Sequence, residues 1–94
     1  REVAEAAIRA NSGADTLTLY ETALLPQSEL SLESAMKSYR SGEADFILLL
    51  DAERELKRMR LDYLKTVFDY RKAVASIERA VGEDLENFKE RDLR

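Results

Sequence analysis

The sequence contains no cysteine, no histidine and no tryptophan, and only three glycines and one proline among its 94 residues. Without cysteine there is neither a disulfide framework nor a thiolate nucleophile. Without cysteine and histidine, the usual ligand sets for zinc, copper and haem are missing as well. These absences exclude most metal and covalent chemistry, so we expect no metal site, no cofactor and no enzymatic activity.

Long apolar runs and an excess of positive charge are also missing. The longest apolar run covers residues 46–50, whereas a membrane-spanning helix needs about 20 apolar residues. Fifteen basic residues stand against 19 acidic ones, a formal net charge of -4, so no general attraction to a phosphate backbone is expected. The sequence predicts one small folding unit that does not bind nucleic acid.

Apolar residues recur at steps of three and four through the second half of the chain. They are Leu49, Ala52, Leu56, Met59, Tyr63, Val67, Tyr70, Val74, Ile77 and Val81. This spacing is close to a heptad repeat and predicts one long coiled-coil helix. Gly82, with Arg79 in the preceding turn, predicts its C-terminal end. At 1.5 Å per residue such a helix spans on the order of 60 Å, which favours an elongated molecule.

A second helical stripe lies in the first half and is interrupted by Pro26. Its members are Leu17, Tyr20, Leu24, Leu30 or Leu32, Ala35, Met36 and Tyr39. Because proline lacks an N–H and fits the first turn of a helix, we expect a kink or a restart at this position. The segment "NSGAD", residues 11–15, predicts a break that separates a short helix over residues 1–10 from the rest.

Gly42 lies where the two apolar stripes meet. A tight turn between two helices usually needs a residue that tolerates positive φ, and glycine does so at little cost. Candidates for the N-cap of the following helix are Ser41, Glu43 and Asp45. We expect Phe46, Leu49 and Leu50 to pack back on Met36 and Tyr39 and so to close an antiparallel hairpin at its tip.

These patterns together predict an all-α fold, because no alternation of period two appears anywhere in the sequence. The predicted architecture is an elongated antiparallel helical hairpin of the coiled-coil type. Residues 1–13 would form a short N-terminal helix and a junction, residues 14–82 the hairpin with its tip at Gly42, and residues 83–94 a charged C-terminal tail.

Two further features of the sequence are candidate sites. Glu53 and Glu55 are neighbouring carboxylates, but residues two apart on a helix point in different directions and make a poor acid–base pair. The basic stretch "RELKRMRLDYLK" is compatible with binding to phosphate or to an acidic membrane surface. The interspersed Glu55 and Asp62 instead favour ordinary ion pairs within the helix.

Residues 19–82 resemble the second helical hairpin of TolC-like outer-membrane efflux channels. The resemblance is carried by "LLPQ" at residues 24–27, "YRSGEADFILLLDAERE" at residues 39–55 and "DYRKAVASIERAVG" at residues 69–82. In that family the helix pair descends from an outer-membrane β-barrel into the periplasm and turns at a glycine, which Gly42 matches. The resemblance implies a fragment of a TolC-like α-barrel, located at the outer membrane with this segment in the periplasm.

The resemblance also implies site residues. The tip residues Arg40, Ser41, Gly42, Glu43 and Ala44 would dock the hairpin of the periplasmic adaptor (membrane fusion) protein. Tyr39 matches a tyrosine that ties neighbouring helices shut at the channel entrance; its alternative role is a core aromatic that closes the hairpin. Asp51 matches an acidic residue of an entrance ring, and its alternative role is a solvated charge beside Arg54 or Glu55.

The sequence departs from the family pattern at two positions of the entrance. Ala44 replaces a basic residue and Leu48 replaces an acidic one, which implies a gate that depends less on charge. The predicted function is a hairpin of an efflux channel that forms conduit wall, associates with copies of itself in a trimer and docks an adaptor for substrate export. The alternative is a generic structural coiled-coil hairpin that mediates protein–protein interaction.

Overall fold

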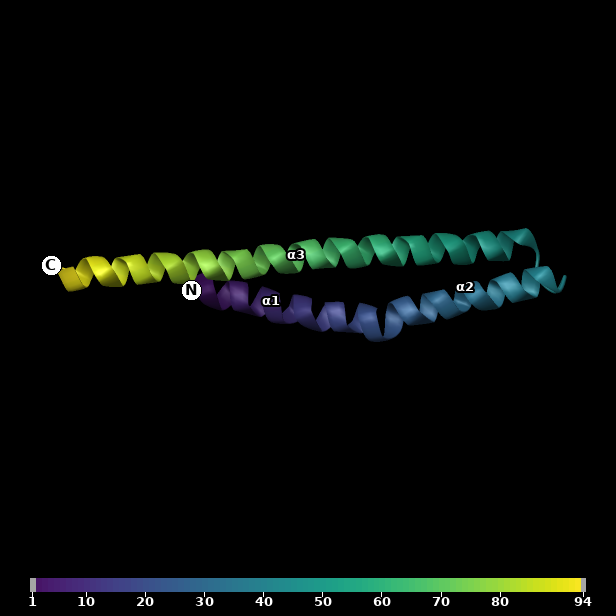
Figure 1. Ribbon diagram of the computed structural model, residues 1–94, viewed down its shortest axis with the longest axis horizontal. Coiled ribbons are helices and arrows are strands. Elements are labelled where there is room, and N and C mark those ends of the chain that lie inside the picture. The colour runs from purple at the N-terminus through teal and green to yellow at the C-terminus, as the bar shows by residue number, and fades with distance from the viewer. Residues whose placement is uncertain (1, 94) are drawn as a thin grey trace.

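A computed structural model describes residues 2–93, and these residues form a long helical hairpin. The first leg consists of helix α1 (Glu2–Leu19), a π-helical turn η1 (Tyr20–Leu24) and helix α2 (Leu25–Arg40), and the return leg is the single helix α3 (Phe46–Leu93). α3 runs antiparallel along the whole first leg and projects beyond its start (Figure 1). The described part contains no strand. The predicted fold class, an all-α elongated antiparallel hairpin, is therefore confirmed.

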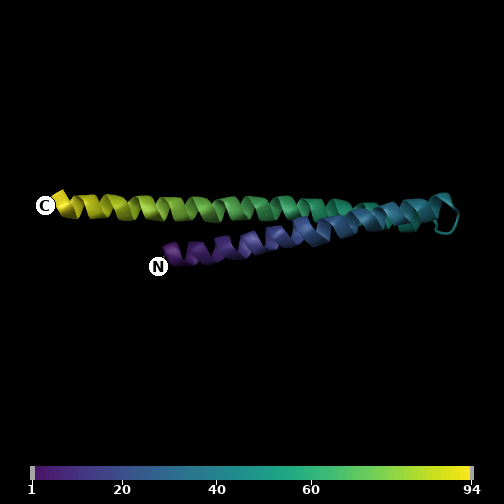
Figure 2. The ribbon, with the colours of Figure 1, turned by 60° about the horizontal axis from the view of Figure 1, so that its bottom comes forward.

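The hairpin is far more extended than a compact domain of the same length. Its principal extents are 79 × 16 × 14 Å and its radius of gyration is 21.6 Å, against about 12 Å for a compact chain of this size. The two legs wrap around one another rather than lying in one plane (Figures 1 and 2). Most side chains therefore touch one neighbouring helix at most, and no large side chain is fully enclosed.

The sequence predicted that the long helix ends at Gly82. In the structure α3 continues to Leu93. Among the described residues only Gly42 has a positive φ, so Gly82 adopts ordinary helical geometry. A glycine inside a helix costs about 1 kcal/mol relative to alanine, and the helix-favouring residues on both sides outweigh that cost. The predicted charged C-terminal tail is consequently helical as far as Leu93, and it is exposed over residues 83–91.

The predicted break at residues 11–15 is also absent, because α1 runs through it. Gly13 packs against α3: a Cβ built on it would lie 3.2 Å from Cδ1 of Tyr70. Nearby, the Thr16 hydroxyl donates to the carbonyl of Ser12 at 2.9 Å within the continuous helix. Contact with α3 overrides the local preference of Asn, Ser and Gly for turns.

The predicted irregularity near Pro26 is confirmed, although its form was not foreseen. The chain passes through the π-helical turn η1, in which the Leu25 N–H donates to the carbonyl of Tyr20, five residues back, and Pro26 then occupies the first turn of α2. The proline ring would crowd a regular preceding turn, and one extra residue in that turn relieves the crowding. The first leg bends at this point (Figure 1).

The seam between the legs follows the predicted stripe on α3 from Leu49 to Ile77, all of which is buried or half-buried. Val81 departs from the prediction, since it is 43% exposed and the neighbouring Ala80 is buried instead. On the first leg Leu32 is half-buried whereas Leu30 is 65% exposed, which decides between these two residues. The remaining buried residues are small ones that the stripe did not include: Ala6, Ser28 and Ala73.

Candidate functional site at the hairpin tip

The turn at the tip is a Schellman motif built around Gly42. The Glu43 N–H donates to the Ser38 carbonyl at 2.9 Å, and the Gly42 N–H donates to the Tyr39 carbonyl at 3.1 Å. These two bonds satisfy carbonyl groups that the last turn of α2 would otherwise leave unpaired. They require a left-handed residue between them, and Gly42 supplies it with φ of 83°. The predicted role of Gly42 in the turn is confirmed.

Asp45 caps the start of α3. Its Oδ1 accepts a hydrogen bond from the Leu48 N–H at 3.3 Å, which is the bond from a cap residue to the third residue of a helix. Of the three predicted candidates, Asp45 is thus the N-cap. Ser41 has another role, because its Oγ donates to the Ser38 carbonyl at 3.1 Å and reinforces the end of α2.

An aromatic pair joins the two legs next to the turn. The rings of Tyr39 and Phe46 lie edge to face with centroids 5.9 Å apart, a geometry that contributes about 0.5–1.5 kcal/mol beyond burial alone. Both residues remain partly accessible, at 44% and 56% exposure. Within one chain Tyr39 therefore contacts Phe46 across the turn, but at 44% exposure it is not the core aromatic that its alternative role predicted. Its role between neighbouring chains stays a prediction.

The apex itself presents a small and accessible surface. Residues 40–43 are exposed and Ala44 is half-exposed, and a Cβ added to Gly42 would meet no atom within 4 Å. The five residues predicted to dock an adaptor, 40–44, thus lie together at one end of the hairpin. The apex therefore exposes backbone groups beside small side chains.

A groove runs from the tip along the junction of α2 and α3. On α2 it is lined mainly by small and polar residues: Gln27, Leu30, Ser31, Ser34, Ala35 and Ser38. Its α3 side carries Leu48 and two carboxylates, Asp51 and Glu55. Asp51 is exposed, so the single chain places it in solvent at the edge of this groove. The serines Ser31, Ser34 and Ser38 recur at steps of three and four, so this polar stripe can be read from the sequence although it lies outside the apolar stripes.

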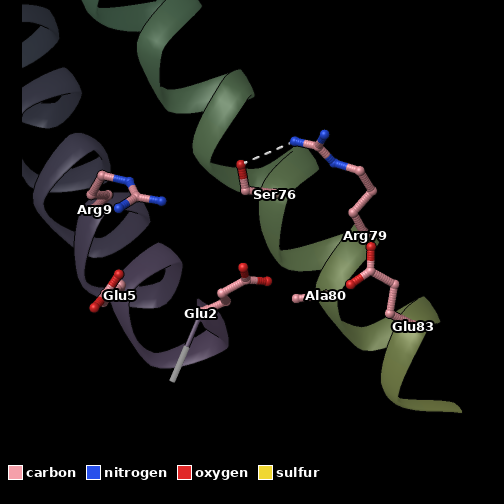
Figure 3. A pocket seen from close by; sticks show the side chains of 7 residues that line it. All are labelled: Glu2, Glu5, Arg9, Ser76, Arg79, Ala80 and Glu83. Carbon is pink, nitrogen blue, oxygen red and sulfur yellow. Dashed lines mark hydrogen bonds between the residues drawn. The ribbon is translucent and has the colours of Figure 1, made fainter. Parts of the chain in front are cut away.

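A second cleft lies at the open end of the hairpin, between the start of α1 and α3 (Figure 3). Glu2, Glu5 and Arg9 line it from α1, opposite Ser76, Arg79, Ala80 and Glu83. The Arg79 guanidinium folds back along its own helix to Ser76 Oγ, 3.4 Å away, rather than across the cleft (Figure 3). The first-turn carboxylates of α1 complement the helix dipole, which accounts for their position without a ligand.

Midway along the hairpin, Tyr63 links α3 to the π-helical turn. Its ring lies edge to face with that of Tyr20 at 6.0 Å, and its hydroxyl donates to Glu21 Oε2 at 3.2 Å. Burial against the first leg raises the pKa of Tyr63, and the hydrogen bond to Glu21 and the charge of Glu21 raise it further. The contact fixes the register of the two legs at the irregular turn.

Within residues 2–93 no set of three or more His, Cys, Asp and Glu side chains is grouped so that it could hold a metal ion. None of the helices over the same residues combines the length and the apolar character needed to span a membrane. The chain matches no protein-family model, no curated protein and no solved structure.

Proposed function

We propose that this chain is a periplasmic helical hairpin of an outer-membrane efflux channel. It forms part of the conduit wall and docks at its tip to the helical hairpin of a periplasmic adaptor protein, and it catalyses no reaction. The proposal starts from the resemblance of residues 19–82 to TolC-like channels. The single structural observation that supports it is the tip: a glycine-centred turn with small exposed residues at the end of a 79 Å hairpin.

The shape of the turn determines how closely two hairpin ends can meet. The Schellman turn leaves a compact apex in which only Arg40 and Glu43 carry long side chains. A second hairpin end can then approach the backbone of residues 41–44 closely and bury both apices. Because a single apex is small, one such contact is weak, and several copies around a ring would add their contributions.

The test is binding of this chain to the isolated helical hairpin of a periplasmic adaptor from the same organism, followed by cross-linking from a cysteine introduced at Ser41. We expect cross-links to the adaptor's tip. A bulky substitution of the glycine itself, Gly42→Trp, would not separate the effect of side-chain size on docking from that of backbone strain, because Gly42 has positive φ. Ser41→Trp adds bulk beside an intact glycine turn and should abolish docking with no loss of helicity.

Two matched variants complete the design. Gly42→Asn alters the glycine but tolerates the left-handed conformation, so it should retain docking. Lys89→Trp adds the same bulk on the exposed extension of α3 and should also retain docking. Docking that survives Ser41→Trp, or cross-links only along the flanks, would reject the tip assignment and favour a generic structural coiled coil.

A further inference from the structure

The set of first-leg residues that faces α3 shifts by one position at η1. In α1 the buried and half-buried positions step by three and four through Ala6, Ala10, Gly13, Leu17 and Tyr20. A regular helix would continue these steps through residue 24 to residues 27, 31, 34 and 38. In α2, however, Ser28, Leu32 and Ala35 are buried or half-buried, each one residue later. We call these three residues the observed frame.

The residues on the uninterrupted spacing form the alternative frame: Gln27, Ser31, Ser34 and Ser38. The first three are exposed, and only Ser38, beside the turn, is half-buried. A π-helical turn contains about one residue more than an α-helical turn, so η1 supplies the shift between the two frames. If η1 became regular, α2 would rotate about its own axis by about 100° and its end would advance by about 1.5 Å.

The alternative frame can face α3 without burying a charge. All four of its residues are uncharged, and three of them are serines, which are small enough for α3 to approach closely. A rotation by one residue in the opposite direction would instead turn Glu29, Glu33 and Arg40 toward α3. Burial of unpaired charges is costly. Of the two one-residue rotations, the sequence therefore permits the one that a regular η1 would produce.

The local structure at η1 suits such a rotation. None of the residues of η1 is buried. Because Pro26 has no N–H, a regular helix through this point would also lack the hydrogen bond to the Thr22 carbonyl. The two arrangements therefore differ little in backbone hydrogen bonding.

Contacts on α3 hold the residues at the start of η1 in place. The Tyr63 ring packs edge to face on Tyr20, and the Tyr63 hydroxyl donates to Glu21 Oε2 at 3.2 Å. At its other end α2 stops at the turn around Gly42, whose φ is 83°. α2 is thus a helical segment between a fixed point on α3 and a glycine turn, and it can rotate while α1 keeps its contacts.

We propose that η1 is a register switch, through which α2 rotates between the observed frame and the alternative frame. The observed frame is the major form, because it partly buries Leu32 and Met36 and avoids crowding by the Pro26 ring. The rotation reorients residues 40–44 relative to α1. A partner that binds one orientation of the tip more tightly shifts the equilibrium by that difference in affinity. The switch belongs to the fold and requires neither a channel nor an adaptor.

The experiment is NMR relaxation dispersion on the backbone amides of the full chain, which detects exchange on the μs–ms timescale. We expect exchange at residues 20–40 with a minor form populated at about 0.1–10%. Residues 3–17 of α1 and the facing residues 66–80 of α3 should show no such exchange, because their contacts are the same in both frames.

Two variants should lock the observed frame by different routes. Deletion of Thr22, which is exposed, removes the inserted residue and makes the observed frame continuous with α1. Ser34→Glu places a carboxylate that is exposed in the observed frame but buried in the alternative one. Each should lower the population of the minor form at least about tenfold. Asn11→Glu adds the same charge at an exposed position of α1 and should leave the exchange unchanged.

A frame-exchange variant should favour the alternative form. It combines Ser31→Leu, Leu32→Ser, Ser34→Ala and Ala35→Ser, so the composition stays the same while the apolar positions of α2 move one residue earlier. We expect its amide chemical shifts over residues 20–40 to match those of the minor form of the native chain.

The proposal is wrong if α2 of the native chain shows no exchange, or if the exchange persists in both locked variants. It is also wrong if the folded frame-exchange variant keeps the chemical shifts of the π-helical turn. Should that variant fail to fold, the native chain and the locked variants decide. Adaptor docking is not measured in any of these samples, so its failure would leave the result unaffected.

Discussion

α3 packs against the first leg in two different ways along its length. Near the tip, opposite α2, its buried residues are Leu49 and Leu56, whereas toward the open end, opposite α1, they are Ala73 and Ala80. Gly13 of α1 lies so close to α3 that an added Cβ would be 3.2 Å from Cδ1 of Tyr70, while α2 meets α3 along a groove lined by serines. Close approach of small residues holds the half toward the open end, and burial of larger side chains holds the half near the tip.

The two halves of the hairpin therefore differ in how much apolar area their contacts bury. Small residues allow helices to approach closely but give each contact little apolar area. Larger residues near the tip bury more area and, together with the Tyr39–Phe46 pair, fix the turn that presents residues 40–44. The π-helical turn η1 lies where the two packing modes meet, and there the first leg changes which of its residues face α3.

The largest effect is expected from Leu56→Ala in the tip half. Leu56 is 4% exposed, and removing a buried leucine side chain costs about 2–5 kcal/mol; the thin core of a hairpin favours the lower end. Chemical denaturation at a fixed protein concentration would measure the loss. Leu85→Ala, at a leucine 59% exposed beyond the paired legs, should leave the free energy of unfolding nearly unchanged.

Gly13→Leu tests the close approach in the open half. The new side chain would meet the Tyr70 ring and force the legs apart, a type of overpacking that costs about 1–3 kcal/mol. Gly82→Leu is the matched control, because a Cβ there meets nothing within 4 Å, and it should stabilise α3 through helix propensity. If both substitutions raised the free energy of unfolding, the close approach of Gly13 to Tyr70 would make no contribution to stability.

Gly42→Ala probes the turn that joins the halves. An alanine at φ of 83° is strained by about 1–2 kcal/mol, and denaturation should show a loss of that size. Gly42→Asn should lose less, since asparagine tolerates the left-handed region. Equal losses for the two variants would point to an effect other than backbone conformation.

The smallest effect concerns pH at the junction of the two packing modes. Burial and Glu21 raise the pKa of Tyr63, so the folded chain favours the neutral phenol. This contribution is fully present below the pKa of an unfolded tyrosine, about 10, and is lost as pH rises through the higher folded value. Above pH 10 the free energy of unfolding should therefore fall more steeply for the native chain than for Tyr63→Phe. Parallel pH profiles for the two chains would contradict the assignment.

The seam of the hairpin could be read from the sequence because a heptad stripe forces a helix to bury one face. The stripe from Leu49 to Ile77 was predicted on this basis, whereas the turn at Gly42 and the irregularity near Pro26 were predicted from the backbone preferences of glycine and proline. The residues grouped at the tip were predicted as well, although their docking role rests on resemblance. Local propensity gave wrong predictions at Gly13 and Gly82, where it predicted helix ends. Packing against Tyr70 keeps the helix continuous at Gly13, and helix-favouring neighbours do so at Gly82.

The sequence alone determined that the chain is helical, that it turns at a glycine and that it has neither cysteine nor histidine, the usual ligands of zinc, copper and haem. Those properties follow from local propensity, periodicity and composition. Only the tertiary structure decided that Leu32 rather than Leu30 faces α3 and that Asp45 caps α3. Such choices depend on how two helices are set against each other, because rotation and register are fixed by contacts between residues far apart in the chain.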